Sequence, residues 1–445
     1  MWRSSGKKLY HVLAQPLFEG GQGEILHEGY KDGQLLSLYG QYMAIQLGEP
    51  PVMRKGGHFA LFALGFRPFF LAAGISALVL MGLWLALWQG VVPAGGHFTL
   101  VEWHAHEMLF GYTAAVVAGF LLTAVRNWTG MAVPTGRLLA SLALLWLAGR
   151  MLVVTPQAPA WLVILTDLAF LPLVAWSLWR PLWHGPNPVN RYFLLFFAGM
   201  TLANGLVHLD VIGVGQAYGL WQRGVYFMVD MVLLVLVLVA GRVIPFFTEK
   251  AVPGSRVTRR NWVEQATFLT LPLAALVELL LPHGALAGVA FMLAALVQGV
   301  RLQGWYGTNH GIWKLPILWV LFLGYAWITL GLALRGLAGF GLFSYPITLH
   351  AITLGGIGVL TLGMMSRVAL GHTGRNINDI GWWMPLAFVL LNLGTVVRVV
   401  LPLVDMQHYR LWINLAGGLW MLAFLIFAVY YTPILIRPRI DGRPG

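Results

Sequence analysis

The stretch RGVYFMVDMVLLVLVLVAGRVIPFF, residues 223–247, decides the fold class of this chain. Between Arg223 and Arg242 lie residues 224–241, and Asp230 is the only charged residue among them. A helix of about 20 predominantly apolar residues crosses the hydrocarbon core of a bilayer, which is about 30 Å thick. The sequence therefore predicts that this segment spans a membrane.

Eleven other apolar runs are long enough to do the same, and the composition of the whole chain agrees. Of its 445 residues, 58% are hydrophobic and 10% are charged, whereas soluble domains carry about 25% charged residues. The predicted fold is an all-α, polytopic transmembrane helix bundle with twelve spans. These spans are expected near 64–89, 103–126, 137–154, 159–179, 191–213, 223–247, 262–281, 285–302, 315–335, 345–368, 382–403 and 410–432.

Charge and cysteine content exclude several kinds of site. The formal net charge is +12, but the basic residues are spread over loops between apolar runs and form no single face, which argues against a nucleic-acid partner. The chain has no Cys, so disulfides and thiolate metal sites are excluded. Any metal must therefore be bound by His, Met or carboxylate side chains.

The distribution of Lys and Arg between alternate connections predicts the orientation of the spans. Cytoplasmic connections carry more of these residues than the opposite side. With a cytoplasmic N-terminus, the inner connections hold Arg126, Arg137, Arg180, Arg191, Lys250, Arg256, Arg259, Arg260, Arg301, Lys314, Arg367 and Arg375. The outer side holds only Arg150, Arg223, Arg335, Arg398 and Arg410. Both termini are therefore predicted to be cytoplasmic, which requires an even number of spans.

The ends of the chain differ from the predicted twelve-span domain, which occupies residues 58–437. Residues 1–57 include a polar, Gly-rich stretch between Gly20 and Gly40 and show no sustained hydrophobic period. This composition is typical of a poorly ordered segment, here a cytoplasmic tail. Met43 or Met53 could be the true start, and the first 42 residues are expected to be dispensable. Residues 438–445 form a second cytoplasmic tail.

Four histidines are predicted to lie at one depth, near the outer leaflet. The second span opens outside with Trp103-His104-Ala105-His106-Glu107-Met108, the fifth ends outside at His208, and the tenth carries His350 on its second turn. Buried imidazoles can be hydrogen-bonded core residues, but intramembrane ionisable residues are rare and mark functional sites. Imidazole is also a ligand for haem iron and for copper. We therefore expect a metal-binding region in the outer half of the bilayer.

Spacing along the helices refines this expectation. His104 and His106 are two residues apart, so on a regular helix they point to nearly opposite sides. They would share one metal only if the span began irregularly; otherwise they serve two different centres. Asn204 lies one turn before His208 on the same face, and it is expected to bind the second ring nitrogen of His208 or to line the pocket.

Other polar residues are assigned by their depth. His372 lies on the cytoplasmic side, about 33 Å along a helix from His350, so it is a separate metal site or a structural residue. Asp167, Asp230 and Glu278 fall in the outer half and are expected to supply protons locally. Three histidines are expected to be solvated in outer loops: His97, His283 and His408.

Several blocks of the sequence, taken in order, resemble one protein family. The blocks are Gly65-Phe66-Arg67-Pro68-Phe69-Phe70, residues 103–108, Asn204 to His208, Gly241 to Thr248, His350 to Gly356, and Met364 to Arg375. Together they resemble the NnrS family of bacterial inner-membrane proteins, over roughly residues 58–435.

The resemblance implies a twelve-span protein that holds haem and copper and acts in nitric oxide metabolism and nitrosative stress in denitrifying and related bacteria. Nitric oxide is therefore an expected partner. A metal centre in the outer half of the bilayer could meet nitric oxide and a periplasmic electron donor directly, and membrane lipid is expected around the spans. The cofactor-binding candidates are His208, His350 and Asn204, and the metal ligand candidates are His104, His106, His208, His350 and His372. The division of these residues between haem and copper stays open.

The reaction also stays open, and a membrane oxidoreductase is one interpretation. The alternative is a membrane transporter or metal-handling carrier whose histidines bind cargo transiently. Inverted repeats with broken helices would favour that alternative.

Overall fold

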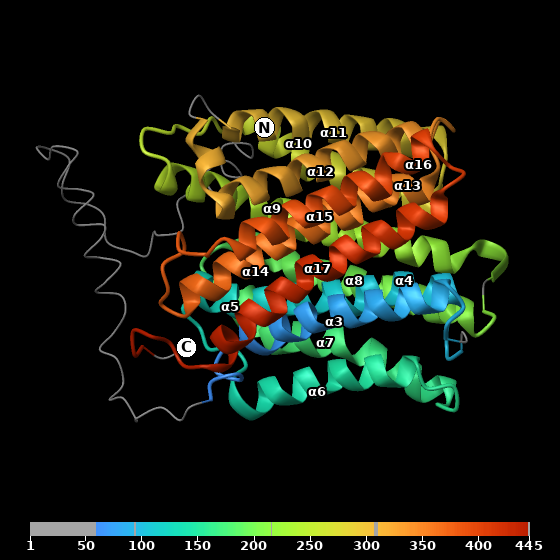
Figure 1. Ribbon diagram of the computed structural model, residues 1–445, viewed down its shortest axis with the longest axis horizontal. Helices are drawn as coiled ribbons and strands as arrows, with labels where there is room; N and C mark the ends of the chain where they lie inside the picture. The colour runs from blue at the N-terminus through green and yellow to red at the C-terminus, as the bar shows by residue number, and fades with distance from the viewer. Residues whose placement is uncertain (1–58, 93–94, 215, 307–309, 444–445) are drawn as a thin grey trace, which may run out of the picture.

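The computed structural model describes residues 59–92, 95–214, 216–306 and 310–443 (Figure 1). Over these residues the chain is helical and contains no strand. Twelve of the helices are long and apolar enough to cross a membrane, which confirms the predicted fold class and number of spans. The predicted tail over residues 1–57, with Met43, lies outside the described residues.

The spans follow one another with short connections. They are formed by α3 (Phe66–Trp88), α4–η1–α5 (Leu100–His106, Glu107–Thr113, Ala114–Thr129), α6 (Gly136–Val153), α7 (Ala160–His184), η2–α8 (Pro188–Arg191, Tyr192–Val211), α9 (Leu220–Ala251), α10 (Asn261–Leu280), α11 (Ala285–Tyr306), α12 (Pro316–Ala338), α13–η5–α14 (Tyr345–His350, Ala351–Gly358, Val359–His372), α15–α16 (Trp383–Val399, Leu401–Val404) and α17 (Tyr409–Ile436). Two short 3₁₀ turns, η3 (Gln216–Tyr218) and η4 (His310–Lys314), lie in connections.

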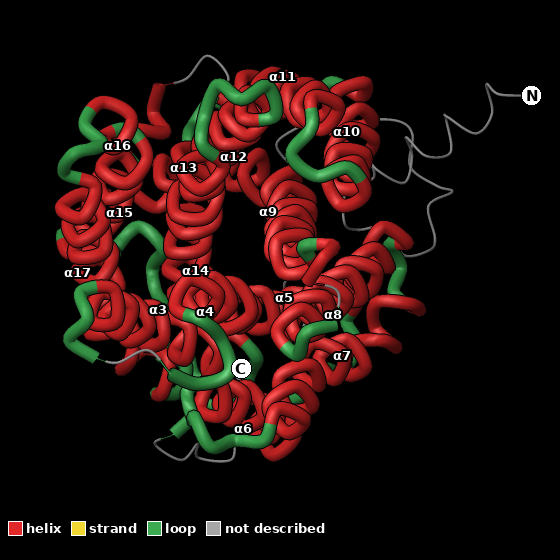
Figure 2. The backbone as a smooth tube through the Cα atoms, turned by 90° about the vertical axis from the view of Figure 1, so that its right-hand side faces the viewer, coloured by secondary structure: helices red, strands yellow, loops and turns green. Residues whose placement is uncertain are grey.

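Three spans form the centre of the bundle. The second, sixth and tenth, namely Leu100–Thr129, Leu220–Ala251 and Tyr345–His372, are the most buried of the twelve. Seen along the bundle, α5, α9 and α14 lie towards the middle, while α6, α11 and α17 lie at the periphery (Figure 2). Polar groups on the inward faces of the central spans therefore meet protein and not lipid.

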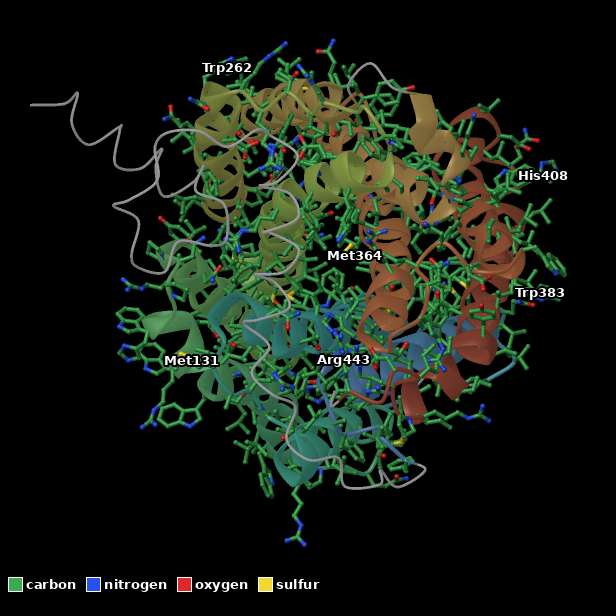
Figure 3. The ribbon with its side chains drawn as sticks, turned by 90° about the vertical axis from the view of Figure 1, so that its left-hand side faces the viewer. Met131, Trp262, Met364, Trp383, His408 and Arg443 are labelled. Atoms are coloured by element: carbon green, nitrogen blue, oxygen red, sulfur yellow. The ribbon has the colours of Figure 1, made fainter. Side chains whose placement is uncertain are left out.

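The periphery carries aromatic side chains at one end of the bundle. Trp262 and Trp383 stand on the first turns of α10 and α15 and are 56% and 47% exposed. Figure 3 shows both at the outside of the bundle. Trp side chains collect at membrane–water interfaces because their rings are amphipathic, so these two residues fit an interface between the bundle and a bilayer.

Two of the central spans change helical type directly after a candidate histidine. His106 ends α4 and is followed by the π-helix η1, and His350 ends α13 and is followed by the π-helix η5. π-Helical stretches are rare and frequently occur at functional sites. Because α4 is regular as far as His106, the rings of His104 and His106 are about 200° apart around the helix. The irregular start that would let them share one metal is therefore absent.

The glycines that follow His350 serve close helix packing. A Cβ on Gly355 would stand 2.7 Å from the Trp327 ring and 2.8 Å from Thr395. A Cβ on Gly356 would stand 2.7 Å from Ile328. These glycines therefore let η5 approach α12 and α15, and helices, not a flat ligand, fill the space beside them.

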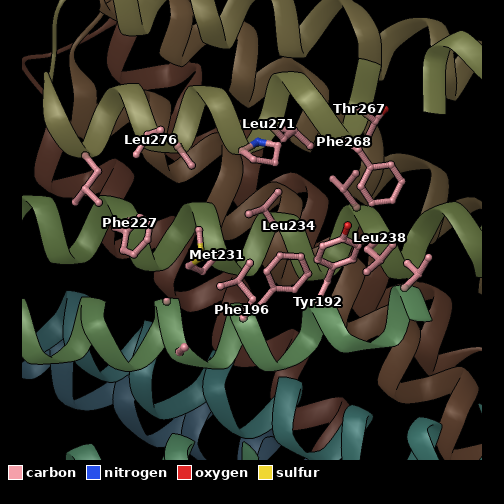
Figure 4. A pocket seen from close by; sticks show the side chains of 18 of the residues that line it. Tyr192, Phe196, Phe227, Met231, Leu234, Leu238, Thr267, Phe268, Leu271 and Leu276 are labelled. Atoms are coloured by element: carbon pink, nitrogen blue, oxygen red, sulfur yellow. The ribbon is translucent and has the colours of Figure 1, made fainter. Parts of the chain in front are cut away.

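A large apolar groove of about 1050 Å³ lies between α8, α9 and α10. Figure 4 shows Phe196, Phe227 and Leu271 among its lining side chains. Arg301 is the one charged residue among those that line it, and that guanidinium pairs with Glu264. The groove therefore lacks the convergent polar groups of a redox site, and its lining is compatible with an apolar ligand.

Candidate metal centre

His106 and His208 converge on one carboxylate. His106 ends α4, His208 lies near the end of α8, and Asp167 lies on α7. The Asp167 Oδ2 atom is 3.1 Å from His106 Nε2 and 3.0 Å from His208 Nε2. One ligand atom from each residue lies within 4.8 Å of the others, and all three residues are buried. Two imidazoles and a carboxylate at this spacing could hold one metal ion.

Asn204 belongs to this group through its bonds to Asp167 and His106. Its amide Nδ2 donates to Asp167 Oδ2 at 2.6 Å, and its Oδ1 is 3.2 Å from His106 Nε2. The expected bond to His208 is absent because both nitrogens of that ring are engaged elsewhere, Nε2 by Asp167 and Nδ1 by His97. Asn204 therefore orients His106 and Asp167.

His97, expected to be solvated, belongs to the same group. Its Nε2 lies 3.1 Å from His208 Nδ1. The neighbouring Phe98 ring packs 4.4 Å from the His106 ring and 5.5 Å from the His208 ring, between centroids, and so holds the loop over the centre. Burial, followed by the nearby His208 and His106 rings, lowers the pKa of His97 to about 4. The ring is therefore neutral at pH 7 and can orient His208, as the outer partners of metal-binding histidines do.

Arg150 and Glu107 are the other two charged residues of this group. Arg150 on α6 donates from Nη1 to Glu107 Oε1 at 2.5 Å and from Nη2 to Asp167 Oδ1. Glu107 Oε1 also lies 3.0 Å from His106 Nδ1, whereas its buried Oε2 has no hydrogen-bond partner among the described residues. With neutral imidazoles, two carboxylates face one guanidinium. The net charge is negative, which favours a cation.

His104 and His350 have other neighbours in the described part of the chain. The His104 ring stacks on Trp84 with centroids 4.2 Å apart. His350 Nδ1 lies 2.5 Å from the carbonyl oxygen of Pro346, one turn earlier on α13.

The structure thus brings two of the four histidines, His106 and His208, to one carboxylate. Convergence of all four on one metal-binding region stays a prediction. His372 lies at the far end of the tenth span, where its ring is 5.6 Å from Phe66 and its carbonyl accepts a 2.7 Å bond from Arg439. In the described part of the chain it shares no hydrogen bond or ring contact with the other four.

Asp230 and Glu278, expected to supply protons, lie in a different polar cluster. Arg335 holds Asp230 through two bonds, of 2.6 and 3.2 Å, and its Nη2 is 3.9 Å from Glu278 Oε1. His283, expected to be solvated, has a side chain only 30% exposed and lies 3.0 Å from Glu278. Across the described residues, no hydrogen bond or ion pair joins this cluster to the group around His106.

Two residues of the group around His106 have no role predicted from the sequence. Arg150 enters the sequence analysis only as a residue that affects topology, and Glu107 only as part of the block around His106. Both lie at the end of the bundle where His106 and Asp167 lie. The position of Arg150 and Glu107 along their spans, which is the signal that groups the histidines, could have grouped these two residues with them. It does not show which side chains are in contact.

A comparison with protein families identifies the family of this chain. A model of the NnrS protein family matches residues 60–439, which is most of the chain. No curated protein matches it. This chain is a multi-pass membrane protein, and it belongs to the NnrS family.

Proposed function

We propose that this protein is a haem–copper protein of the bacterial inner membrane that acts in the nitric oxide response or in protection from nitrosative stress. It does so by redox chemistry at a metal site in the outer half of the bilayer, or by binding nitric oxide there. The observation that carries the proposal is the convergence of His106, Asp167 and His208, with ligand atoms within 4.8 Å of one another in a buried place.

The residues present fit a copper ion. Imidazole nitrogen suits copper, and both Nε2 atoms face the same Asp167 oxygen, so a cation can take the place of the protons between them. Copper, when bound, would exchange single electrons and offer a coordination position to nitric oxide. The chain itself holds the ligands in place: Arg150 fixes Asp167, Asn204 fixes His106, and His97 fixes His208.

The shape of the central spans supports this function over that of a carrier. Secondary transporters commonly bind cargo at unwound midpoints of broken helices. The second and tenth spans here run continuously as helix, from Leu100 to Thr129 and from Tyr345 to His372, with a π-helical stretch in place of a break.

Optical spectroscopy and elemental analysis of the purified protein test the proposal. We expect a haem Soret band that shifts when nitric oxide is added, together with bound copper. Among single His→Ala exchanges at positions 104, 106, 208 and 350, at least three should lower haem or copper content while the protein still inserts. Wild-type protein without haem and copper, or four variants that all keep both, would refute the proposal.

A further inference from the structure

The apolar groove between α8, α9 and α10 is longer than one lipid leaflet is deep. On α10 its lining runs from Gln265 to Leu279, which is about 21 Å at the helical rise of 1.5 Å per residue. One half of the hydrocarbon core of a bilayer is about 15 Å thick. Leu202 and Leu276 line the groove and are 53% and 51% exposed, so it is open on the side that faces lipid. An acyl chain can therefore enter the groove from the bilayer and lie along it.

One end of the groove is polar, and α8 and α10 both begin at that end. Tyr192 and Phe268 line it there, with their ring centroids 6.5 Å apart (Figure 4). Arg301 also lines this end, but its guanidinium is paired with Glu264 and bonded to the Val237 carbonyl. The inside of the groove therefore carries no net charge. By the predicted topology this end faces the cytoplasm.

Three exposed arginines flank this polar end. Arg191 directly precedes α8, and Arg259 and Arg260 directly precede α10. No carboxylate in the described part of the chain pairs with any of the three, because the acidic residue nearest to them on α10, Glu264, is held by Arg301. The positive charge at this end is therefore available to an anion outside the groove.

The opposite end of the groove differs in this respect. Its one nearby arginine, Arg223, is half-buried and donates to the backbone carbonyls of Tyr218 and Leu279. An anionic group is therefore favoured at the first end of the groove over the second.

Charge and shape together select the occupant. A phospholipid offers a long apolar chain for the groove and a phosphate for the arginines at its end. Basic residues beside membrane spans on the cytoplasmic side bind anionic headgroups. A zwitterionic headgroup is less suitable, because its ammonium group would meet three uncompensated positive charges. A free phosphate would satisfy the arginines but leave the groove without an occupant of its own.

We infer that the groove binds an anionic phospholipid of the inner leaflet, with one acyl chain along α8 and α10 and the phosphate at Arg191, Arg259 and Arg260. Among the described residues, none that lines the groove belongs to the group around His106. The lipid site is therefore separate from the proposed metal centre.

Native mass spectrometry of the full-length protein in detergent tests the headgroup. The probes are phosphatidylglycerol and phosphatidylethanolamine with identical acyl chains, and we expect phosphatidylglycerol to bind more tightly. An arginine near the membrane surface contributes about 1 kcal/mol to the binding of anionic lipid, which is about fivefold in affinity. Arg191→Gln and Arg260→Gln should each weaken phosphatidylglycerol binding by about that factor. Arg410→Gln removes an exposed arginine from the opposite end of the bundle and should have no effect.

A pair of tryptophan variants tests the groove. Leu276 lines it, whereas Leu273 lies on the same helix, is 48% exposed and is not part of the lining. Leu276→Trp should lose the tightly bound phosphatidylglycerol, and Leu273→Trp should keep it. If Leu276→Trp does not insert, Leu202→Trp is measured in its place. Inorganic phosphate, added at the same concentration as the lipid, should not displace it.

Three results would overturn the inference. They are equal affinity for the two lipids, equal retention of phosphatidylglycerol by the groove variant and by Leu273→Trp, and displacement of the lipid by inorganic phosphate.

Discussion

Exchange of Asp167 for Asn probes the convergence of His106 and His208 most directly. The Oδ2 atom of Asp167 faces His106, His208 and Asn204, and its Oδ1 faces Arg150. An amide has one oxygen and one NH₂ group. In either orientation, its NH₂ group would face N–H groups, either those of Arg150 or those on the side of His106, His208 and Asn204. The exchange also removes the net negative charge that attracts a cation.

The expected loss follows from the position of this carboxylate. Removing a group that binds or orients metal ligands lowers metal affinity about 10–100-fold, which is about 1.4–2.8 kcal/mol. Asp167→Asn should therefore weaken copper binding by that factor. A competition titration with a copper chelator measures the affinity, and elemental analysis measures the copper content.

A matched control makes this result specific. Asp405 lies in a connection, and its side chain is 37% exposed. It accepts from the backbone N–H groups of Gln407 and His408 and pairs with His408 Nδ1. Asp405→Asn should leave copper affinity as in the wild type. If Asp167→Asn binds copper as tightly as Asp405→Asn, the carboxylate does not belong to the metal centre and the reasoning from its three neighbours is wrong.

Two further predictions concern stability and orientation. Arg335→Gln should lower the free energy of unfolding by about 3–5 kcal/mol, because it leaves buried carboxylates unpaired. Asp230→Asn should lower it less, since Arg335 keeps Glu278 at 3.9 Å. SDS titration in mixed micelles measures both losses, and equal losses would contradict this difference. Reporters fused after Pro93 and after Arg256 should report the outside and the inside respectively, and the same side for both would disprove the predicted topology.

The spans could be predicted from the sequence because crossing a bilayer imposes a simple requirement, about 20 apolar residues per helix. The common depth of the outer histidines followed from the span order. Their partners did not follow, because hydropathy does not specify which helices meet or which way a side chain turns. The pairing of Arg150 with Asp167, and the position of His97 against His208, depend on contacts between three or more segments of the chain. The π-helices also left no recognisable pattern in composition.

The π-helix η1 sets the phase between the two halves of the second span. A π-helix closes its hydrogen bonds one residue further along than an α-helix. Deleting one residue from Glu107–Thr113 would allow a continuous α-helix, and α4 would then turn by about 100° relative to α5. His106 would swing away from Asp167 and His104 away from Trp84, although the segment would remain long and apolar enough to cross the bilayer. The apolar composition therefore keeps this segment a membrane span. The one extra residue in the π-helix determines whether its histidines reach their partners.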